Sequence, residues 1–105
     1  MEHRWGRRVP VQLPVRIRSL DGGTPAAGHM VNLSVSGALI ATEHDAGAFS
    51  GVEIAVNNDW VLSWVTRRDP GKLAVEWMVM APQSVIRQLE VAELTRTAAR
   101  EPALA

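Results

Sequence analysis

Short runs of alternating apolar and polar residues, separated by turn sequences, restrict the fold of this chain more than any other feature. In the clearest run, residues 11–18, the apolar residues occupy every second position: Val11, Leu13, Val15 and Ile17. Further strands are predicted at residues 28–35, 38–42, 52–56, 60–64 and 73–79. Short strands at this spacing are typical of a small antiparallel barrel or sandwich.

Turn sequences mark the ends of several of these strands. Asp21-Gly22-Gly23, Asn57-Asn58-Asp59 and Asp69-Pro70-Gly71 each combine residues that favour tight turns. Residues 43–51 are mostly polar and contain glycine, so we expect a longer loop there. Pro14 cannot donate a ladder hydrogen bond, which indicates an edge strand or a bulge in the first run.

The pattern changes after Pro82, where apolar residues follow helical spacing. Proline suits the first turn of a helix. We therefore predict an all-β protein, with six antiparallel strands in a barrel or sandwich, a flexible N-terminal arm and a C-terminal α-helix. The boundaries that we assign are 1–10 for the arm, 11–80 for the strands, 81–99 for the helix and 100–105 for a frayed tail.

Composition excludes several classes of protein. The chain has 105 residues, which suits one domain, and 47% of them are hydrophobic, which is ordinary for a globular fold. Lys and Arg balance Asp and Glu at 11 each, so no global charge favours DNA, RNA or an anionic membrane. Cysteine is absent, which excludes disulfides and thiolate metal sites. We recognise no signal peptide or membrane-spanning run, and we expect a cytoplasmic protein.

Three arginines, Arg4, Arg7 and Arg8, lie close together in the predicted arm. A guanidinium donates two parallel hydrogen bonds to a phosphate, and its charge does not titrate away. The same planar group can pair with the O6 and N7 acceptors of guanine or stack on a purine. By themselves, these residues also fit an ordinary solvated basic terminus.

A second polar cluster, Asn32, Ser34 and Gly37, ends the second predicted strand. We expect Val31, Leu33 and Val35 to face the core, which would leave the Asn32 and Ser34 side chains together on the outer face. Those groups can read a base edge or hold a sugar-phosphate. Glycine next to them permits a positive φ or the close approach of a ligand. A polar outer face followed by a turn glycine is the plainer alternative.

Taken in order, Arg4-xxx-Arg8 and Asn32-x-Ser34-x-x-Gly37 resemble the RxxxR and [D/N]xSxxG motifs of the PilZ domain family. The Val-Pro-Val and Leu-Pro-Val sequences after Arg8 are similar to the first strand of that family, and residues 73–77 are similar to its last strand. The resemblance covers nearly the whole chain, and it implies that the strands form a six-stranded antiparallel β-barrel. The two motifs in the correct order are more specific than either motif alone.

This resemblance implies a receptor for cyclic di-GMP, a bacterial second messenger. The residues that would bind the ligand are Arg4, Arg7, Arg8, Asn32, Ser34 and Gly37. Ligand would order the arm against the barrel, and a downstream effector protein would recognise the resulting surface. The resemblance implies no cofactor besides this ligand, and it leaves the oligomeric state open.

The remaining polar and aromatic residues carry weaker signals. The histidines do not have the spacing of a metal site: His3, His29 and His44. Three tryptophans are predicted to lie in the core rather than to form a stacking platform: Trp60, Trp64 and Trp77. Neither serine of the second motif has a histidine base nearby in the sequence, so we do not expect an enzyme.

Two other functions stay open at this level. The first is a protein-interaction adaptor with the same fold that does not bind nucleotide. The second is a small barrel that binds single-stranded nucleic acid, which would need a basic groove with exposed aromatic residues. The zero net charge makes the second function less favourable than the first.

Overall fold

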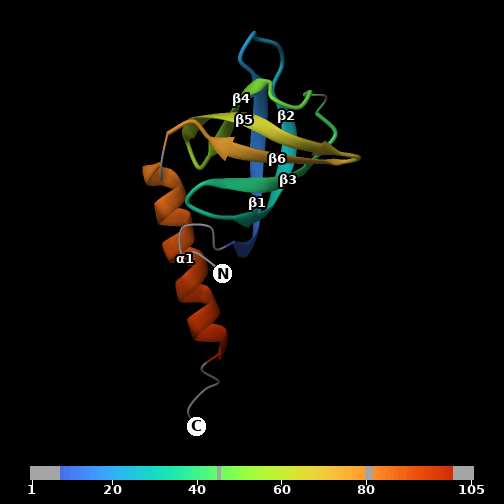
Figure 1. Ribbon diagram of the computed structural model, residues 1–105. Helices are drawn as coiled ribbons and strands as arrows, with labels where there is room; N and C mark the ends of the chain where they lie inside the picture. Colours follow the sequence, from blue (N-terminus) through green and yellow to red (C-terminus); the bar gives the residue numbers. More distant parts are fainter. Residues whose placement is uncertain (1–7, 45, 80–81, 101–105) are drawn as a thin grey trace.

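A computed structural model describes residues 8–44, 46–79 and 82–100. In these ranges, six strands form a closed antiparallel barrel that is followed by a helix (Figure 1). The elements are β1 (Val9–Ser19), β2 (Ala26–Leu33), β3 (Gly37–Thr42), β4 (Gly51–Val56), β5 (Asp59–Asp69), β6 (Lys72–Trp77) and α1 (Gln83–Arg100). Around the barrel the order is β1-β2-β3-β6-β5-β4. The predicted all-β fold, a six-stranded antiparallel barrel with a C-terminal helix, is confirmed, whereas residues 1–7 of the predicted arm lie outside the described residues.

The core fills the inside of the barrel and follows the alternation of the sequence. In β4, Val52, Ile54 and Val56 are fully buried, as their spacing predicted. β1 buries Val15 and Ile17, whereas Val11 and Leu13 are partly buried and pack against the core. The other fully buried large side chains come from β2, β3, β5 and β6 and include Met30, Leu33, Ile40, Val65, Leu73 and Val75.

A β-bulge in β2 changes which of its residues face inward. The pairing with β3 shifts register between Met30 and Asn32. Met30 and Leu33 are therefore both fully buried, although they are three residues apart. The prediction that Val31 and Val35 face the core together with Leu33 is wrong, because both valines are only half-buried.

The outer face of β5 differs from the sequence prediction. Val61, Ser63 and Val65 are the buried residues of this strand, so the intervening positions face outward. Trp64 is 48% exposed and does not belong to the core. Trp60 is half-buried on the outside of the barrel, where the Arg18 guanidinium carbon lies 4.0 Å from the centre of its ring.

The predicted turns are present where the chain reverses direction. Asn57 has a φ of 56° in the β4–β5 hairpin, and Gly71 has a φ of 74° in the β5–β6 hairpin. The first strand begins at Val9, two residues earlier than predicted, and its pairing with β2 is irregular between Pro10 and Leu13. β1 pairs with β4 only from Arg16 onward, so the missing N–H of Pro14 costs no bond to β4.

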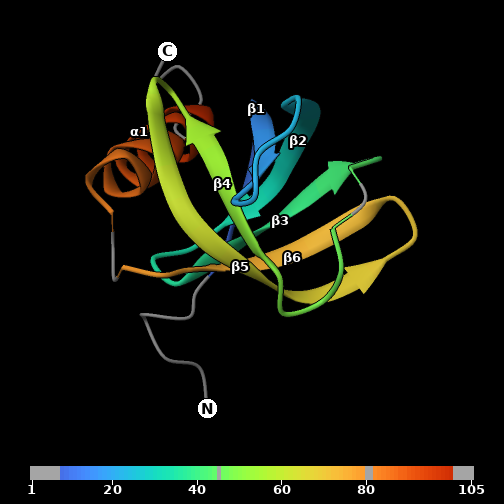
Figure 2. The same cartoon turned by 90° about the horizontal axis from the view of Figure 1, so that it is seen from above.

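α1 begins at Gln83, as the helical spacing after Pro82 indicated, and the amide of Ile86 donates to the Pro82 carbonyl at 3.0 Å. Val85 is fully buried and anchors the first turn. The helix packs against β1 on the outside of the barrel, and Figures 1 and 2 show it lying beside the barrel wall. Figure 1 also shows its C-terminal half extending past the barrel.

Candidate ligand-binding site

The turn between β2 and β3, residues 34–36, is built around the hydroxyl of Ser34. This oxygen accepts hydrogen bonds from the backbone amides of Ser36 and Gly37, both at 3.2 Å. The Ser34 amide in turn donates to the Gly37 carbonyl at 2.8 Å. Ser34 is only 1% exposed. The expectation that its side chain lies on the outer face beside Asn32 is therefore wrong, because Ser34 lies in the turn after β2, where its hydroxyl bonds the turn amides instead of following the alternation of the strand.

Trp77 of β6 holds this turn against the barrel. Its indole Nε1 donates to the Ser34 carbonyl at 3.2 Å, and its backbone amide donates to the Ser36 carbonyl at 2.9 Å. The side chain of Trp77 is buried, as predicted for this tryptophan. The turn therefore has a fixed position relative to β6.

Gly37, the first residue of β3, makes the close approach of β3 and β6 possible. A Cβ atom built on Gly37 would overlap the backbone carbonyl oxygen of Val75. Its φ is not in the positive region, where the glycines Gly22, Gly23 and Gly71 lie. The backbone of β6 occupies the space in which a side chain at position 37 would lie. The glycine is therefore required by the packing of the two strands and not by a left-handed backbone conformation.

The two sequence motifs meet at Arg8 and Asn32. Arg8 is exposed, and its Nη1 donates to the Asn32 Oδ1 at 2.8 Å. The strand register explains the contact, because Pro10 of β1 is paired with Asn32 of β2. Asn32 follows the β2 bulge and is half-buried. Arg4 and Arg7 lie outside the described residues, so the contact joins one arginine of the first motif to the second motif.

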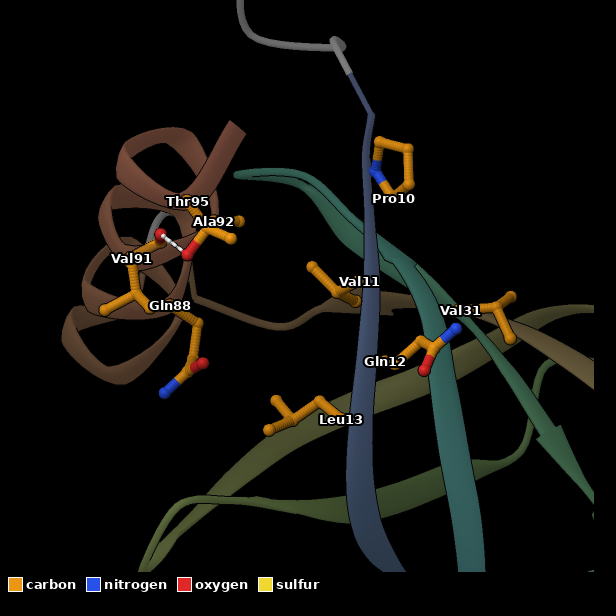
Figure 3. Close-up of a pocket in the computed structure, with 9 residues that line it drawn as sticks. All are labelled: Pro10, Val11, Gln12, Leu13, Val31, Gln88, Val91, Ala92 and Thr95. Atoms are coloured by element: carbon orange, nitrogen blue, oxygen red, sulfur yellow. Dashed lines mark hydrogen bonds between the residues drawn. The ribbon is translucent and has the colours of Figure 1, made fainter. Parts of the chain in front are cut away.

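A groove of about 650 Å³ lies between β1 and α1, next to this contact (Figure 3). Val11 and Leu13 point from β1 towards the helix in Figure 3. The complete lining is Pro10, Val11, Gln12, Leu13, Val31, Gln88, Val91, Ala92 and Thr95. Its volume is within the range of about 300–1,000 Å³ that small-molecule sites occupy. Sequence reasoning did not find the groove, because no local pattern says where the helix packs.

The groove combines apolar walls with a few amide and hydroxyl groups. Gln12 and Gln88 contribute primary amides, which can donate and accept hydrogen bonds at a base edge. The Thr95 hydroxyl donates to the Val91 carbonyl at 3.0 Å, so its oxygen keeps lone pairs that can accept a hydrogen bond. A flat heterocycle has the shape and the polarity that such a groove accommodates.

The histidines in the described ranges do not contribute to this site. His44 is within hydrogen-bonding distance of the Ser19 hydroxyl at 3.3 Å, and His29 is exposed on β2. In residues 8–44, 46–79 and 82–100, no three His, Asp or Glu side chains are grouped so that they could hold a metal ion. None of the helical residues in those ranges forms a segment long and apolar enough to span a membrane.

Ser34→Ala is expected to destabilise the fold by about 1–3 kcal/mol, because two backbone amides lose the acceptor that they share. Urea unfolding followed by circular dichroism measures this change. Ser36→Ala is the matched control, since Ser36 is exposed and, among the described residues, its hydroxyl is hydrogen-bonded only to the Ser34 hydroxyl, at 3.1 Å. Equal stability of the two variants would contradict the role that we assign to Ser34.

Known structures share this arrangement of strands. The PilZ domain of CeSA from a cellulose-synthesizing bacterium has a TM-score of 0.65 and 23% identity, over 84% of this chain and 99% of that chain. The PilZ domain with c-di-GMP of YcgR from Escherichia coli has a TM-score of 0.61 and 12% identity, over 96% of each chain. No family model matches the sequence, and no curated protein matches it significantly. The chain therefore has the PilZ-domain fold.

Proposed function

We propose that this protein is a receptor for cyclic di-GMP and is not an enzyme. The observation that carries the proposal is the hydrogen bond between Arg8 and Asn32, which joins the RxxxR motif to the [D/N]xSxxG motif. The fold supports it, since the neighbouring PilZ domain of YcgR is recorded with c-di-GMP. The bond connects an exposed cation to a half-buried amide, which is a suitable pair for a phosphate and a base.

In this proposal each described residue has a separate task. Arg8 exchanges its bond with Asn32 for the phosphate or guanine of the ligand, and the Asn32 amide then contacts the ligand directly. A guanine base enters the groove between β1 and α1, where Gln88 meets its edge. Ser34 and Gly37 do not contact the ligand. They hold the turn that follows Asn32 and the start of β3, and so keep Asn32 in position.

The arginines of the arm complete the site. Arg4 and Arg7 would contact phosphates from the solvent side, and the arm would become ordered over the ligand. Ordering the arm reduces the affinity but creates a new surface that an effector protein can recognise. The receptor would act in the cytoplasm.

Isothermal titration calorimetry with cyclic di-GMP tests this function. Saturable binding is expected, whereas the linear dinucleotide pGpG and GTP should bind much more weakly because they lack the closed arrangement of two guanines. A titration that gives no heat and no shift in melting temperature with cyclic di-GMP would reject the receptor function.

The alternative is an adaptor that has the same fold and docks a protein without a nucleotide. The exposed apolar side chains of Leu62 and Trp64 support this alternative. They lie side by side on the outer face of β5, where a partner protein could pack on them. An adaptor would bind its partner equally well in the presence and absence of cyclic di-GMP. The titration above therefore separates the two functions.

A further inference from the structure

A second groove lies between α1 and the turn that joins β2 to β3. Its volume is about 560 Å³, and its lining is Val35, Ile86, Leu89, Glu90, Glu93 and Leu94. The helical residues among these recur at intervals of three and four positions, so they form one stripe of α1. The groove between β1 and α1 uses a neighbouring stripe, which includes Gln88 and Ala92. The second groove is therefore separate from the proposed guanine site.

Apolar side chains and carboxylates line the second groove together. Leu89 is half-buried, whereas Leu94 is 71% exposed and could be covered by a further apolar group. Glu90 and Glu93 are both exposed and belong to the same stripe of the helix. A group that fits this groove is therefore apolar and is flanked by positive charge.

The first described residues place the start of the chain near this groove. Arg8 donates to Asn32, and Val9 is paired with Leu33, the last residue of β2. The turn that contains Val35 follows directly after β2. The residues that precede Arg8 therefore leave β1 at the end of the barrel where Val35 lines the second groove.

The sequence of the arm is complementary to the second groove. Trp5 is flanked by Arg4 and Arg7, which all precede the described part of the chain. An extended chain covers about 3.3–3.6 Å per residue, so the Cα atom of Trp5 can lie up to about 10 Å from that of Arg8. An indole has a large apolar surface, and the guanidinium groups on both sides of it can pair with the two carboxylates of the groove.

We propose that, in the ligand-free protein, the Trp5 indole occupies the second groove and places Arg4 and Arg7 next to Glu90 and Glu93. The anchoring of the chain at Arg8 favours the arm as the occupant. A short tether gives an effective concentration in the millimolar range, so docking of the arm needs little intrinsic affinity.

The docked arm would regulate the proposed receptor, and this consequence rests on the proposed function. Arg4 and Arg7 cannot pair with the carboxylates of α1 and with the phosphates of cyclic di-GMP at the same time. The nucleotide therefore binds only to the fraction of molecules in which the arm is free, and its apparent affinity falls by that fraction. Ligand binding would move the arm from the second groove to the nucleotide.

Nuclear magnetic resonance of the full chain without nucleotide tests the docked arm. The chain has four tryptophans, and Trp5→Phe identifies the indole N–H signal of Trp5 by its loss. Nuclear Overhauser effects are expected between this indole and the methyl groups of Leu89 and Leu94. Their absence would overturn the proposal. The same effects between a labelled and an unlabelled copy would also overturn it, because the occupant would then be the arm of a second molecule.

A substitution in the groove makes this experiment specific. Leu94→Gln should move the Trp5 indole signal towards its position in a peptide of residues 1–8, in which no groove is present. Leu94 is exposed, so the variant should fold. Val91→Gln is the matched control, because Val91 is 51% exposed on the same helix and lines only the groove next to β1. A larger shift with Val91→Gln would place the indole in that groove and overturn the proposal.

A charge reversal tests the pairing of the arm with the helix. Glu90→Lys should also move the Trp5 indole signal towards that of the peptide, because like charges then meet. Glu43→Lys makes the same change directly after β3, at the opposite end of this strand from the β2–β3 turn, and should leave the signal in place. An equal response to the two variants would overturn the proposed pairing.

Calorimetry with cyclic di-GMP tests the regulation separately. Leu94→Gln should tighten binding about threefold to tenfold, as release of an arm that is docked in most molecules would do. The substitution changes no charge, and Leu94 does not line the groove between β1 and α1. Unchanged affinity would overturn the regulation. Binding by neither protein would reject the receptor function, while the Overhauser effects, which need no nucleotide, would still decide whether the arm is docked.

Discussion

Gly37→Ala is expected to lower the free energy of unfolding by about 3 kcal/mol, the upper end of the usual range for an overpacked position. The added Cβ overlaps the carbonyl oxygen of Val75, which belongs to the backbone of β6 and cannot rotate away. β3 must then separate from β6, and the turn that Ser34 organises loses its support. Thermal unfolding followed by circular dichroism should show a fall in Tm of roughly 15 °C for a domain of this size.

Gly47→Ala is the control for that experiment. Gly47 lies in the loop between β3 and β4, its φ is not positive, and nothing is within 4 Å of the position of an added Cβ. Its Tm should stay within a few degrees of that of the unmodified chain. If Gly37→Ala unfolded at the same temperature as Gly47→Ala, the close approach of β3 and β6 would not be the reason for a glycine at this position.

Arg8→Ala is expected to weaken the binding of cyclic di-GMP by about 30- to 100-fold. This corresponds to the loss of about 2–3 kcal/mol from charge-assisted hydrogen bonds to the ligand. Arg8 is exposed and contacts Asn32 only at its tip, so the fold should be unaffected. Isothermal titration calorimetry at a fixed salt concentration measures the change, because binding to phosphates depends on ionic strength.

Two variants make the Arg8 experiment specific. Arg67→Ala removes an exposed arginine whose ion pair with Asp69 lies at the β5–β6 hairpin, and it should bind the ligand like the unmodified chain. Arg8→Lys keeps the charge but loses the planar fork, so its affinity should be intermediate. Unchanged affinity in Arg8→Ala would show that the ligand binds elsewhere.

Much of the barrel could be predicted from local patterns. Val52, Ile54 and Val56 alternate because the strand period is two, and the turn at Asn57 needs residues that tolerate a positive φ. These relations involve neighbours in the sequence only. The order of the two motifs could also be recognised, and the contact between Arg8 and Asn32 agrees with the expectation that the motifs lie together.

Local sequence patterns could not predict which residues of β5 face outward. Trp60, Leu62 and Trp64 alternate with Val61, Ser63 and Val65, and the sequence favours the set with larger apolar side chains for the core. The barrel buries the other set, because its interior accommodates small and medium side chains at these positions. The choice depends on the space that the facing strands leave, which is a property of the closed barrel.

The sequence by itself determined that this chain forms strands with turns between them, and that one polar motif precedes the first strand and another ends the second strand. The tertiary structure decided how the motif residues are placed. Ser34 faces inward because its hydroxyl bonds the turn amides and Trp77 of β6 holds the turn, and the approach of β6 explains Gly37. Both effects depend on β6, which is distant in the sequence and lies beside β3 only because the strands close into one barrel.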